Sequence, residues 1–146
     1  MCRTAHVFIL LVLPASAWSD EAAAVKFVEK LGGQVERYKD AGGEPVLVVR
    51  LDRTEITDKG LKQLAGLKNV KVLNLYDTKV TDAGLKGLAA LKDLEALDLR
   101  ATPVTDKGLK ELTPLKQLRQ LLLDKGISDD AVTALQKALP DCKVIR

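Results

Sequence analysis

The residue types that perform catalysis are few and scattered in this sequence. His6 is the only histidine, and the two cysteines, Cys2 and Cys142, lie at opposite ends of the chain. A hydrolase triad, a HExxH site or a thiolate zinc site requires several such residues in a defined arrangement. The chain also lacks the GxxxxGK and GxGxxG phosphate-binding loops. The sequence therefore predicts no catalytic residue, no metal site and no cofactor site.

Carboxylates are the remaining groups that could perform acid/base or metal chemistry. Asp52 and Asp98 could form an acid/base pair, but we expect both on an open sheet rather than in a desolvated pocket that would give them different roles. An acidic segment superficially suggests a calcium loop and contains Asp124, Ser128, Asp129 and Asp130. An EF-hand requires a central glycine and a glutamate at its twelfth position, where this chain has Leu135. We therefore expect a protein that is not an enzyme.

The length and composition of the chain are those of one ordinary globular domain, whose elements must position any functional side chains. The chain has 146 residues, a net charge of +3, 47% hydrophobic residues and only 3% aromatic residues. These values argue against intrinsic disorder. Two cysteines are too few for a miniprotein stapled by disulfides. The chain must therefore be stabilised by a hydrophobic core.

Residues 1–17 have the three-part layout of a secretory signal peptide. Arg3 precedes an apolar run at 7–13, and Pro14 and the small residues at 15–17 follow. The run is far shorter than the ~20 residues of a membrane-spanning helix, so a membrane anchor is the weaker alternative. We expect cleavage after Ala17 and export to the periplasm, the cell envelope or the extracellular space, without a transmembrane segment in the mature chain.

The sequence repeats itself with a period of 24 residues. The segment VVRLDRTEITDKGL at 48–61 returns as VLNLYDTKVTDAGL at 72–85 and as ALDLRATPVTDKGL at 96–109. A fourth copy is one residue short around Gly126, and a fifth begins at Cys142. One unit cannot bury its own apolar face, but stacked units share a continuous core. The repeat therefore predicts a stack of similar units.

Each unit changes its apolar period, which indicates a strand followed by a helix. Leu73 and Leu75 alternate, whereas the leucines that follow are three residues apart, at positions 85, 88, 91 and 94. We expect Thr81 to cap the helix and Asp82 to complement its dipole, and the same of the Thr-Asp pairs at 57–58 and 105–106.

Two further sets of repeated residues are expected to be structural. Glycines at 60, 84 and 108 weaken helix propensity, so we expect close packing between neighbouring units at these positions. Thr54, Thr78 and Thr102 are expected to form hydrogen bonds between the turns of successive repeats.

The repeat resembles that of the leucine-rich repeat family. The LxxLxLxxN opening of that family corresponds to Val70, Leu73, Leu75 and Thr78. The VTDxGL start of each helix is similar to the cysteine-containing, ribonuclease-inhibitor-like branch. The segments LGG, VTDAGLK and LPDCKV resemble short exported proteins of planctomycete-type bacteria. The resemblance covers about residues 31–146 and implies an α/β leucine-rich repeat solenoid, a horseshoe with a parallel concave sheet and convex helices; it does not imply an activity.

The domain organisation follows from the repeat boundaries. After the signal peptide, we expect residues 18–45 to form an N-terminal cap made of a helix and a hairpin strand, with Gly32 and Gly33 ending the helix. Residues 46–146 contain about four full repeats and a terminal strand. We expect the cap to cover the core of the first repeat, whereas the terminal strand leaves an exposed edge.

Residues that alternate with the core leucines are the best candidates for binding. We expect three outward columns on the sheet: Val48, Val72, Ala96, Gln120 and Val144; Arg50, Asn74, Asp98, Leu122 and Arg146; and Asp52, Tyr76, Arg100 and Asp124. An apolar column beside mixed charges and a tyrosine suits an unidentified protein or an extended peptide. The alternative is a solvated face whose charges aid solubility and register.

Two other features leave alternatives open. Lysines on the helix side could bind a polyanion or the cell envelope by electrostatics, and they are Lys59, Lys62, Lys68, Lys86, Lys92, Lys107, Lys110 and Lys116. Acidic residues nearly balance them and aromatic stacking partners are missing, so we do not expect nucleic-acid binding. We expect Cys142 to be a buried structural thiol, the alternative being a homodimer crosslinked through the C-terminal edge.

Overall fold

The computed structural model describes residues 15–39 and 41–146. Most of the predicted signal peptide, residues 1–14, lies outside the described residues. The elements follow along the chain, with η denoting a 3₁₀ helix, as α1 (Ala15–Lys30), β1 (Gln34–Lys39), β2 (Pro45–Arg50), α2 (Asp58–Leu61), η1 (Lys62–Gly66), β3 (Val70–Asn74), α3 (Asp82–Leu85), η2 (Lys86–Ala90), β4 (Ala96–Asp98), η3 (Gly108–Leu112), β5 (Gln120–Leu122), α4 (Asp129–Ala138) and β6 (Lys143–Ile145).

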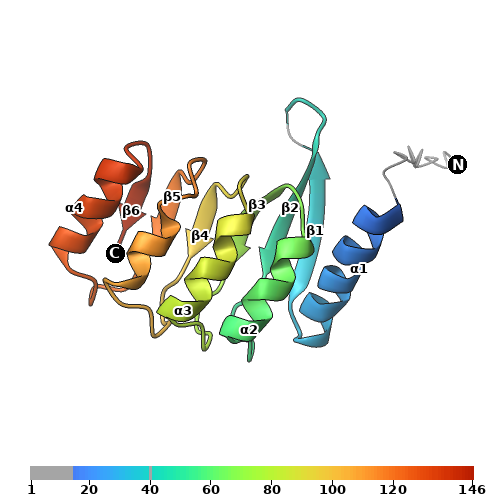
Figure 1. Ribbon diagram of the computed structural model, residues 1–146, viewed down its shortest axis with the longest axis horizontal. Helices are drawn as coiled ribbons and strands as arrows, with labels where there is room; N and C mark the ends of the chain where they lie inside the picture. The colour runs from blue at the N-terminus through green and yellow to red at the C-terminus, as the bar shows by residue number, and fades with distance from the viewer. Residues whose placement is uncertain (1–14, 40) are drawn as a thin grey trace, which may run out of the picture.

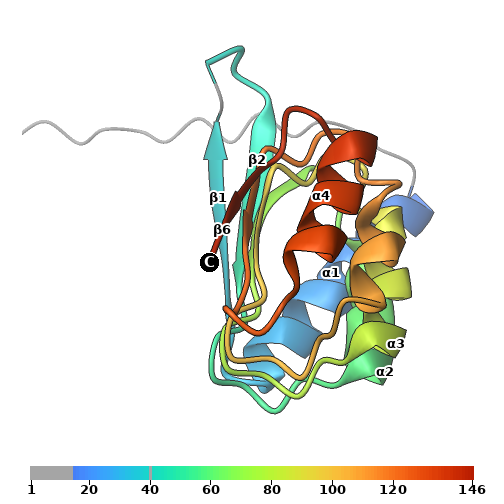
Figure 2. The same ribbon diagram turned by 90° about the vertical axis from the view of Figure 1, so that its left-hand side faces the viewer.

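The described strands form one sheet in sequence order, from β1 to β6 (Figure 1). β1 and β2 are antiparallel, and every later pair of neighbours is parallel. The helices lie on one face of the sheet, and no described element covers the opposite face (Figure 2). A mostly parallel sheet backed by helices agrees with the predicted α/β solenoid.

The strand register follows the sequence repeat as far as β5. Val72 pairs with Ala96, and Ala96 pairs with Gln120, so residues 24 positions apart are neighbours. In the last pair of strands Gln120 lies beside Lys143, because the fourth unit is one residue shorter. Val144 therefore lies beside the buried Leu121 and packs against the core. The expectation that Val144 and Arg146 continue the outward columns is wrong, because a shift of one residue exchanges the two faces of a strand.

The core is a continuous stack of leucines between the sheet and the helices. The repeated strand-end leucines 51, 75, 99 and 123 are at most 2% exposed, and Leu61, Leu85 and Leu109 from the helices are equally buried. Burying one such side chain contributes roughly 1.5–3 kcal/mol. These leucines belong to one hydrophobic cluster that runs through the stacked units, so the repeats stabilise one another.

The helices are shorter and tighter than the sequence pattern predicted. α2 and α3 are single turns that continue directly into η1 and η2, and the third unit has only η3. A 3₁₀ helix has three residues per turn, so the three-residue spacing of Leu85, Leu88 and Leu91 places these leucines on one face. Only α4 is a regular α-helix of several turns among the repeats, with Val132 and Leu135 buried.

The repeated threonines stabilise their own turns instead of linking successive repeats. The Oγ1 atoms of Thr54, Thr78 and Thr102 donate hydrogen bonds to the carbonyls three residues earlier, at 2.7, 2.8 and 2.6 Å. The expectation of bonds between repeats is wrong, because this short side chain reaches its own turn first.

Hydrogen bonds between repeats come from the aspartates at the helix starts. Asp58 accepts from both the backbone N–H and the hydroxyl of Thr81, at 2.7 Å each. Asp82 accepts the equivalent bonds from Thr105, at 2.7 and 2.6 Å. Asp106 accepts from the backbone N–H of Ser128 at 3.0 Å. These bonds form an aspartate ladder along the stack, with Asp58, Asp82 and Asp106 as its acceptors.

The predicted helix caps are weaker than expected. Thr57 makes no cap hydrogen bond with its side chain. Thr81 accepts a long bond of 3.3 Å from the N–H of Ala83, and Thr105 accepts one of 3.4 Å from Lys107. The hydroxyl hydrogens of Thr81 and Thr105 point to the preceding aspartate, so these threonines serve mainly the ladder.

The glycines make room for the aspartate ladder. A Cβ on Gly84 would clash with the carboxylate of Asp58, and one on Gly108 would clash with that of Asp82. At Gly60, the start of the stack, a Cβ would lie 2.8 Å from Ile56 and 3.0 Å from Phe27. The expected close packing at these glycines is therefore present, and its cause at the two later positions is a carboxylate of the preceding unit.

The N-terminal segment packs on the first repeat. α1 contacts η1 and β1, and its Ala24 and Val28 are buried in the core. The hairpin of β1 and β2 pairs Glu36 with Val48 and Gln34 with Arg50. None of the described helices is long and apolar enough to cross a membrane.

At the other end of the stack, Arg146 folds back onto the start of α4. Its guanidinium donates to the carbonyl of Ile127 at 2.9 Å and to the carboxylate of Asp129. Cys142 is buried, and burial raises the pKa of its thiol. The structural thiol that the sequence predicted is therefore confirmed, and a buried, protonated thiol is a poor crosslinking group.

Replacing Gly84 with alanine should destabilise the protein although alanine favours helices. The new Cβ displaces the Asp58 carboxylate from Thr81, and we expect a loss of about 1–3 kcal/mol in the free energy of unfolding, measured with urea. Gly87→Ala is the matched control in the next element, because its Cβ would lie 3.5 Å from Leu61 in ordinary contact. A Gly84→Ala variant as stable as Gly87→Ala would contradict this role of the glycine.

Replacing Ser128 with alanine should raise the pKa of Asp106. The hydroxyl of Ser128, followed by its backbone N–H, lowers the pKa of the Asp106 carboxyl from its ordinary 3.8. Because the folded-state pKa is the lower one, this contribution to stability is present above the unfolded-state pKa and is lost as the pH falls through the folded-state value. We expect a carboxyl NMR titration to show a higher pKa for Asp106 in Ser128→Ala, and an unchanged pKa would exclude the contact.

Candidate functional site

The open sheet face consists of the outward side chains of β1–β5, on the side that no described helix covers (Figure 2). Val48, Val72, Ala96 and Gln120 form one row across neighbouring strands, and Arg50, Asn74, Asp98 and Leu122 form the next. Neighbours in a row are about 4.8 Å apart. The structure therefore brings the predicted side chains of both rows into one continuous surface.

The predicted residues differ in exposure. Arg50, Arg100, Gln120 and Asp124 are exposed, whereas the other predicted residues are partly buried: Val48, Asp52, Val72, Asn74, Tyr76, Asp98 and Leu122. Apolar Val48, Val72 and Ala96 occupy the middle of the sheet, and charged residues lie toward the carboxyl ends of the strands. The face thus has an apolar centre beside a polar margin.

Tyr76 lies in the polar margin of the open sheet face, where several contacts hold it in place. The guanidinium carbons of Arg53 and Arg100 lie 5.7 and 5.6 Å from the centroid of its ring. Both separations are within the range of cation–π attraction. The backbone also holds Tyr76, whose N–H donates to Asn74 Oδ1 at 2.9 Å and whose carbonyl accepts from the N–H of Arg53 at 2.8 Å. We call Arg53, Tyr76 and Arg100 the arginine–tyrosine cluster.

Asp98 holds Arg100 in this cluster. The Arg100 Nη2 donates to Asp98 Oδ2 at 2.6 Å and Nε donates to Oδ1 at 3.0 Å, a two-point pairing of guanidinium and carboxylate. Asp98, by its hydrogen bond and its charge, raises the pKa of Arg100. Asp98 also accepts the backbone N–H of Arg100 at 3.1 Å. Asp98 therefore holds the Arg100 guanidinium beside the ring of Tyr76.

Asp124 has a structural contact that the sequence did not indicate. In the first two turns, the N–H of Arg53 donates to the carbonyl of Tyr76, and that of Asp77 donates to the carbonyl of Arg100. In the third turn, the N–H of Ala101 donates instead to Asp124 Oδ2 at 2.8 Å. The carboxylate replaces a backbone acceptor at the irregular fourth repeat. Asp124 is therefore partly committed to the fold.

The acidic side chains of the open sheet face have different neighbours. Asp52 contacts the amide of Asn74 at 3.4 Å, whereas Asp98 pairs with Arg100, so each carboxylate has its own neighbour. Strand β3 separates the two positions. Among the described residues, no group of three or more histidine, cysteine or acidic side chains could hold a metal ion.

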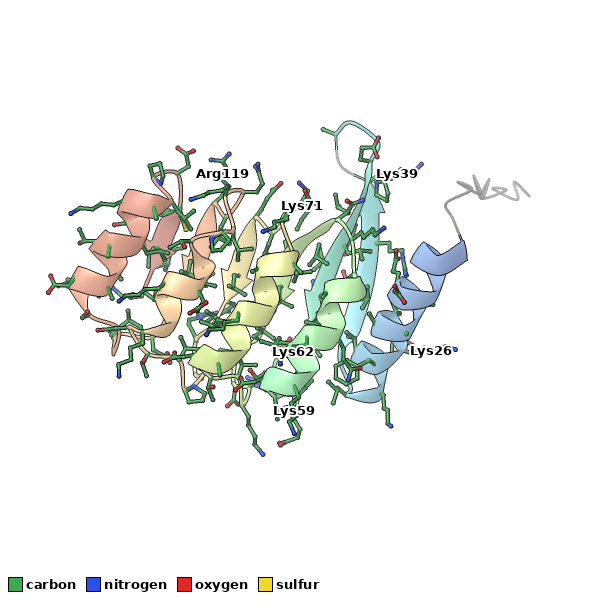
Figure 3. The ribbon with its side chains drawn as sticks, viewed as in Figure 1. Lys26, Lys39, Lys59, Lys62, Lys71 and Arg119 are labelled. Carbon is green, nitrogen blue, oxygen red and sulfur yellow. The ribbon has the colours of Figure 1, made fainter. Side chains whose placement is uncertain are left out.

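Cationic side chains are distributed over different parts of the molecule. Lys59 and Lys62 come from α2 and η1 on the helix side, whereas Lys71 and Arg119 lie at the opposite ends of the repeats (Figure 3). Lys71 pairs with Glu95 at 2.5 Å, and Arg119 pairs with Asp141 at 2.7 Å. All eight predicted helix-side lysines are exposed. The labelled cations do not gather on one patch.

Sequence reasoning missed two parts of this surface. β1 extends the open sheet face, because Gln34 and Glu36 lie opposite Arg50 and Val48, and Arg50 Nη1 pairs with Glu36 at 3.1 Å. The predicted hairpin could have revealed this extension, because the turn of a hairpin sets which residues of its two strands lie opposite each other. Arg53 has a left-handed φ of 57°, which arginine rarely adopts, so no sequence signal indicated its position over Tyr76.

Comparison with known proteins identifies the repeat. Residues 66–89 and 90–112 match the family model described as Leucine Rich repeat. No curated protein matches the chain significantly. Among solved structures, the chain is similar to the leucine-rich repeat ectodomain of the receptor kinase SOBIR1 from Arabidopsis thaliana, with 17% identity over 86% of this chain and 90% of that chain and a TM-score of 0.42. The family match over residues 66–112 coincides with stacked units of strand and helix, so this part of the chain is similar to leucine-rich repeats in both sequence and fold.

Proposed function

We propose that this protein is a non-catalytic binding module that recognises another protein or an extended peptide through the open sheet face. Leucine-rich repeat domains generally mediate protein–protein binding, and their stacked strands provide an extended surface for it. This proposal assigns the contacts to Val48, Val72 and the arginine–tyrosine cluster.

The arginine–tyrosine cluster is the observation that carries the proposal. Tyrosine and arginine are enriched among the residues that dominate binding energy at interfaces. Tyr76 is held by two guanidiniums and two backbone hydrogen bonds before any partner arrives, which reduces the entropy lost on binding. The neighbouring apolar row supplies area that a partner can desolvate, and the charged margin supplies specificity.

Polyanion binding through the helix-side lysines has less support. Lys86 already lies 4.0 Å from the carboxylate of Glu111. Binding of that kind weakens steeply with salt. Salt dependence therefore distinguishes it from recognition by the open sheet face.

Changing the cluster should abolish capture of the partner. We expect the purified chain to retain a protein from the native cell envelope, and the Arg53→Ala/Tyr76→Ala variant to bind that protein at least about 10-fold more weakly. Lys59→Ala/Lys62→Ala is the matched control on the helix side and should bind normally. Equal loss in both variants, or salt-sensitive capture that only the lysine variant loses, would refute the proposal.

Tyr76→Phe tests whether partner binding depends on the aromatic ring of Tyr76 and not on its hydroxyl. Phenylalanine keeps the ring between the two arginines, so we expect this variant to bind within about threefold of the original chain. Urea unfolding of each variant verifies that any loss of capture occurs in a folded protein.

We also propose that residues 1–17 direct export and are then removed. The proposal is supported by the layout of the segment, and cleavage after Ala17 would leave Ala24 and Val28 of α1 in place to pack on the first repeat. We expect intact-mass analysis of the exported protein to give a chain that begins at Trp18. Ala17→Arg should prevent processing, whereas Lys26→Ala should not, and an exported chain that retains Met1 would contradict cleavage.

A further inference from the structure

A hollow lies on the helix side of the molecule, between η3 of the third unit and α4 of the fourth. It has a volume of about 420 Å³, which is within the range of small-molecule sites. Its walls contain two buried leucines, Leu109 and Leu135, and the small apolar side chains of Ala131 and Ala134. The open sheet face lies on the other side of the sheet (Figure 2). We call this hollow the η3–α4 groove.

The groove coincides with a break in the glycine pattern of the repeat. In the third unit, a Cβ on Gly108 would lie only 2.3 Å from Asp82 Oδ1 of the preceding unit. Because the fourth unit is one residue short, the equivalent position is that of Ala131, whose methyl group cannot accept so close a contact. The N–H of Ser128 accordingly reaches Asp106 at 3.0 Å, whereas the two earlier bonds of the aspartate ladder are 2.7 Å. Ala131 therefore keeps α4 away from η3 and leaves the groove between them.

The margin of the groove carries cations without partners. Lys107 and Lys110 are exposed, and neither side chain forms an ion pair within the described part of the chain. The described lining also contains two acidic side chains. Asp106 is engaged by Ser128, so Asp130 is the unpaired acid that opposes the lysines. The unpaired groups around the apolar walls therefore carry a net positive charge.

We propose that the η3–α4 groove binds a small amphiphilic carboxylate. Its hydrocarbon chain lies against Leu109 and Leu135, and burial of this chain supplies most of the affinity. Its carboxylate lies at Lys107 and Lys110, which donate charge-assisted hydrogen bonds. The lysines are open to water, so the charge changes affinity only several-fold. The inference goes beyond the proposed function, because it concerns a small ligand on the opposite side of the sheet.

Titration of the full chain with sodium octanoate, below its micellar concentration, tests this inference by NMR. We expect saturable shifts of the methyl signals of Leu109, Ala131 and Leu135, with a Kd on the order of 1 mM. Octylammonium has the same chain and the opposite charge, and it should bind at least about threefold more weakly. Acetate has the charge without the chain and should not saturate these shifts. Absence of saturation by octanoate, or equal binding of either control ligand, would overturn the proposal.

A pair of matched lysine variants locates the carboxylate. Lys107→Gln/Lys110→Gln should lose the preference for octanoate over octylammonium, because only the acidic side chains then remain at the margin. Lys59→Gln/Lys62→Gln makes the same change of charge on the helix side, outside the groove, and should keep the preference. A preference that survives in the groove variant would overturn the assignment of the carboxylate.

Ala131→Gly tests what opens the groove. Glycine restores the space that the earlier units have, so α4 should approach η3, and octanoate should bind at least about threefold more weakly. Thr133→Gly is the matched control, because it weakens the same helix at an exposed position outside the groove. Equal binding by the two variants would refute the role of Ala131. Arg53→Ala/Tyr76→Ala should bind octanoate normally, so this test and partner capture can fail independently.

Discussion

Everything in this structure depends on the burial of leucines between stacked repeats. One unit contributes a strand of three to six residues and one short helical segment, which could not bury Leu73 or Leu85 by itself. Stacking buries these side chains against the neighbouring units. The stability therefore comes from the contacts between units and not from one unit alone. The aspartate ladder adds a polar connection on the same axis, and it is satisfied only when the next unit is in register.

The open sheet face is a consequence of that stacking. The described helices lie on one face, where they cover the leucines, so the outward residues of the strands stay uncovered on the other face (Figure 2). The backbone that fixes the stack also fixes this face, since the hydrogen bonds that join successive turns hold Tyr76 between Arg53 and Arg100. Asp124 differs from Tyr76, because its carboxylate accepts a backbone hydrogen bond from Ala101 and so takes part in the fold. The proposed binding function uses this rigidity, because a preorganised surface loses little conformational entropy on binding.

The sequence was informative where one residue type repeats at a fixed step. The 24-residue spacing predicted the stack, and the alternation of Leu73 and Leu75 predicted which side chains face outward. The sequence was misleading where a short side chain has two possible hydrogen-bond partners. Thr78 bonds its own turn, and Asp82 bonds the next unit, because donors and acceptors from neighbouring units become available only after stacking. Helix type was also decided by packing, since 3₁₀ turns keep leucines three residues apart on the core side.

By itself, the sequence determined the class of fold, the buried leucines, the buried thiol of Cys142 and the outward rows from β2 to β5, because each of these follows from local periodicity. Only the tertiary structure decided the register of β6, the extension of the open sheet face by β1, and the arginine–tyrosine cluster. These features bring together residues from different units. The deleted residue and the hairpin turn were visible in the sequence, but their effect on strand register became clear only once the strands paired. The left-handed backbone of Arg53 had no sequence signal at all.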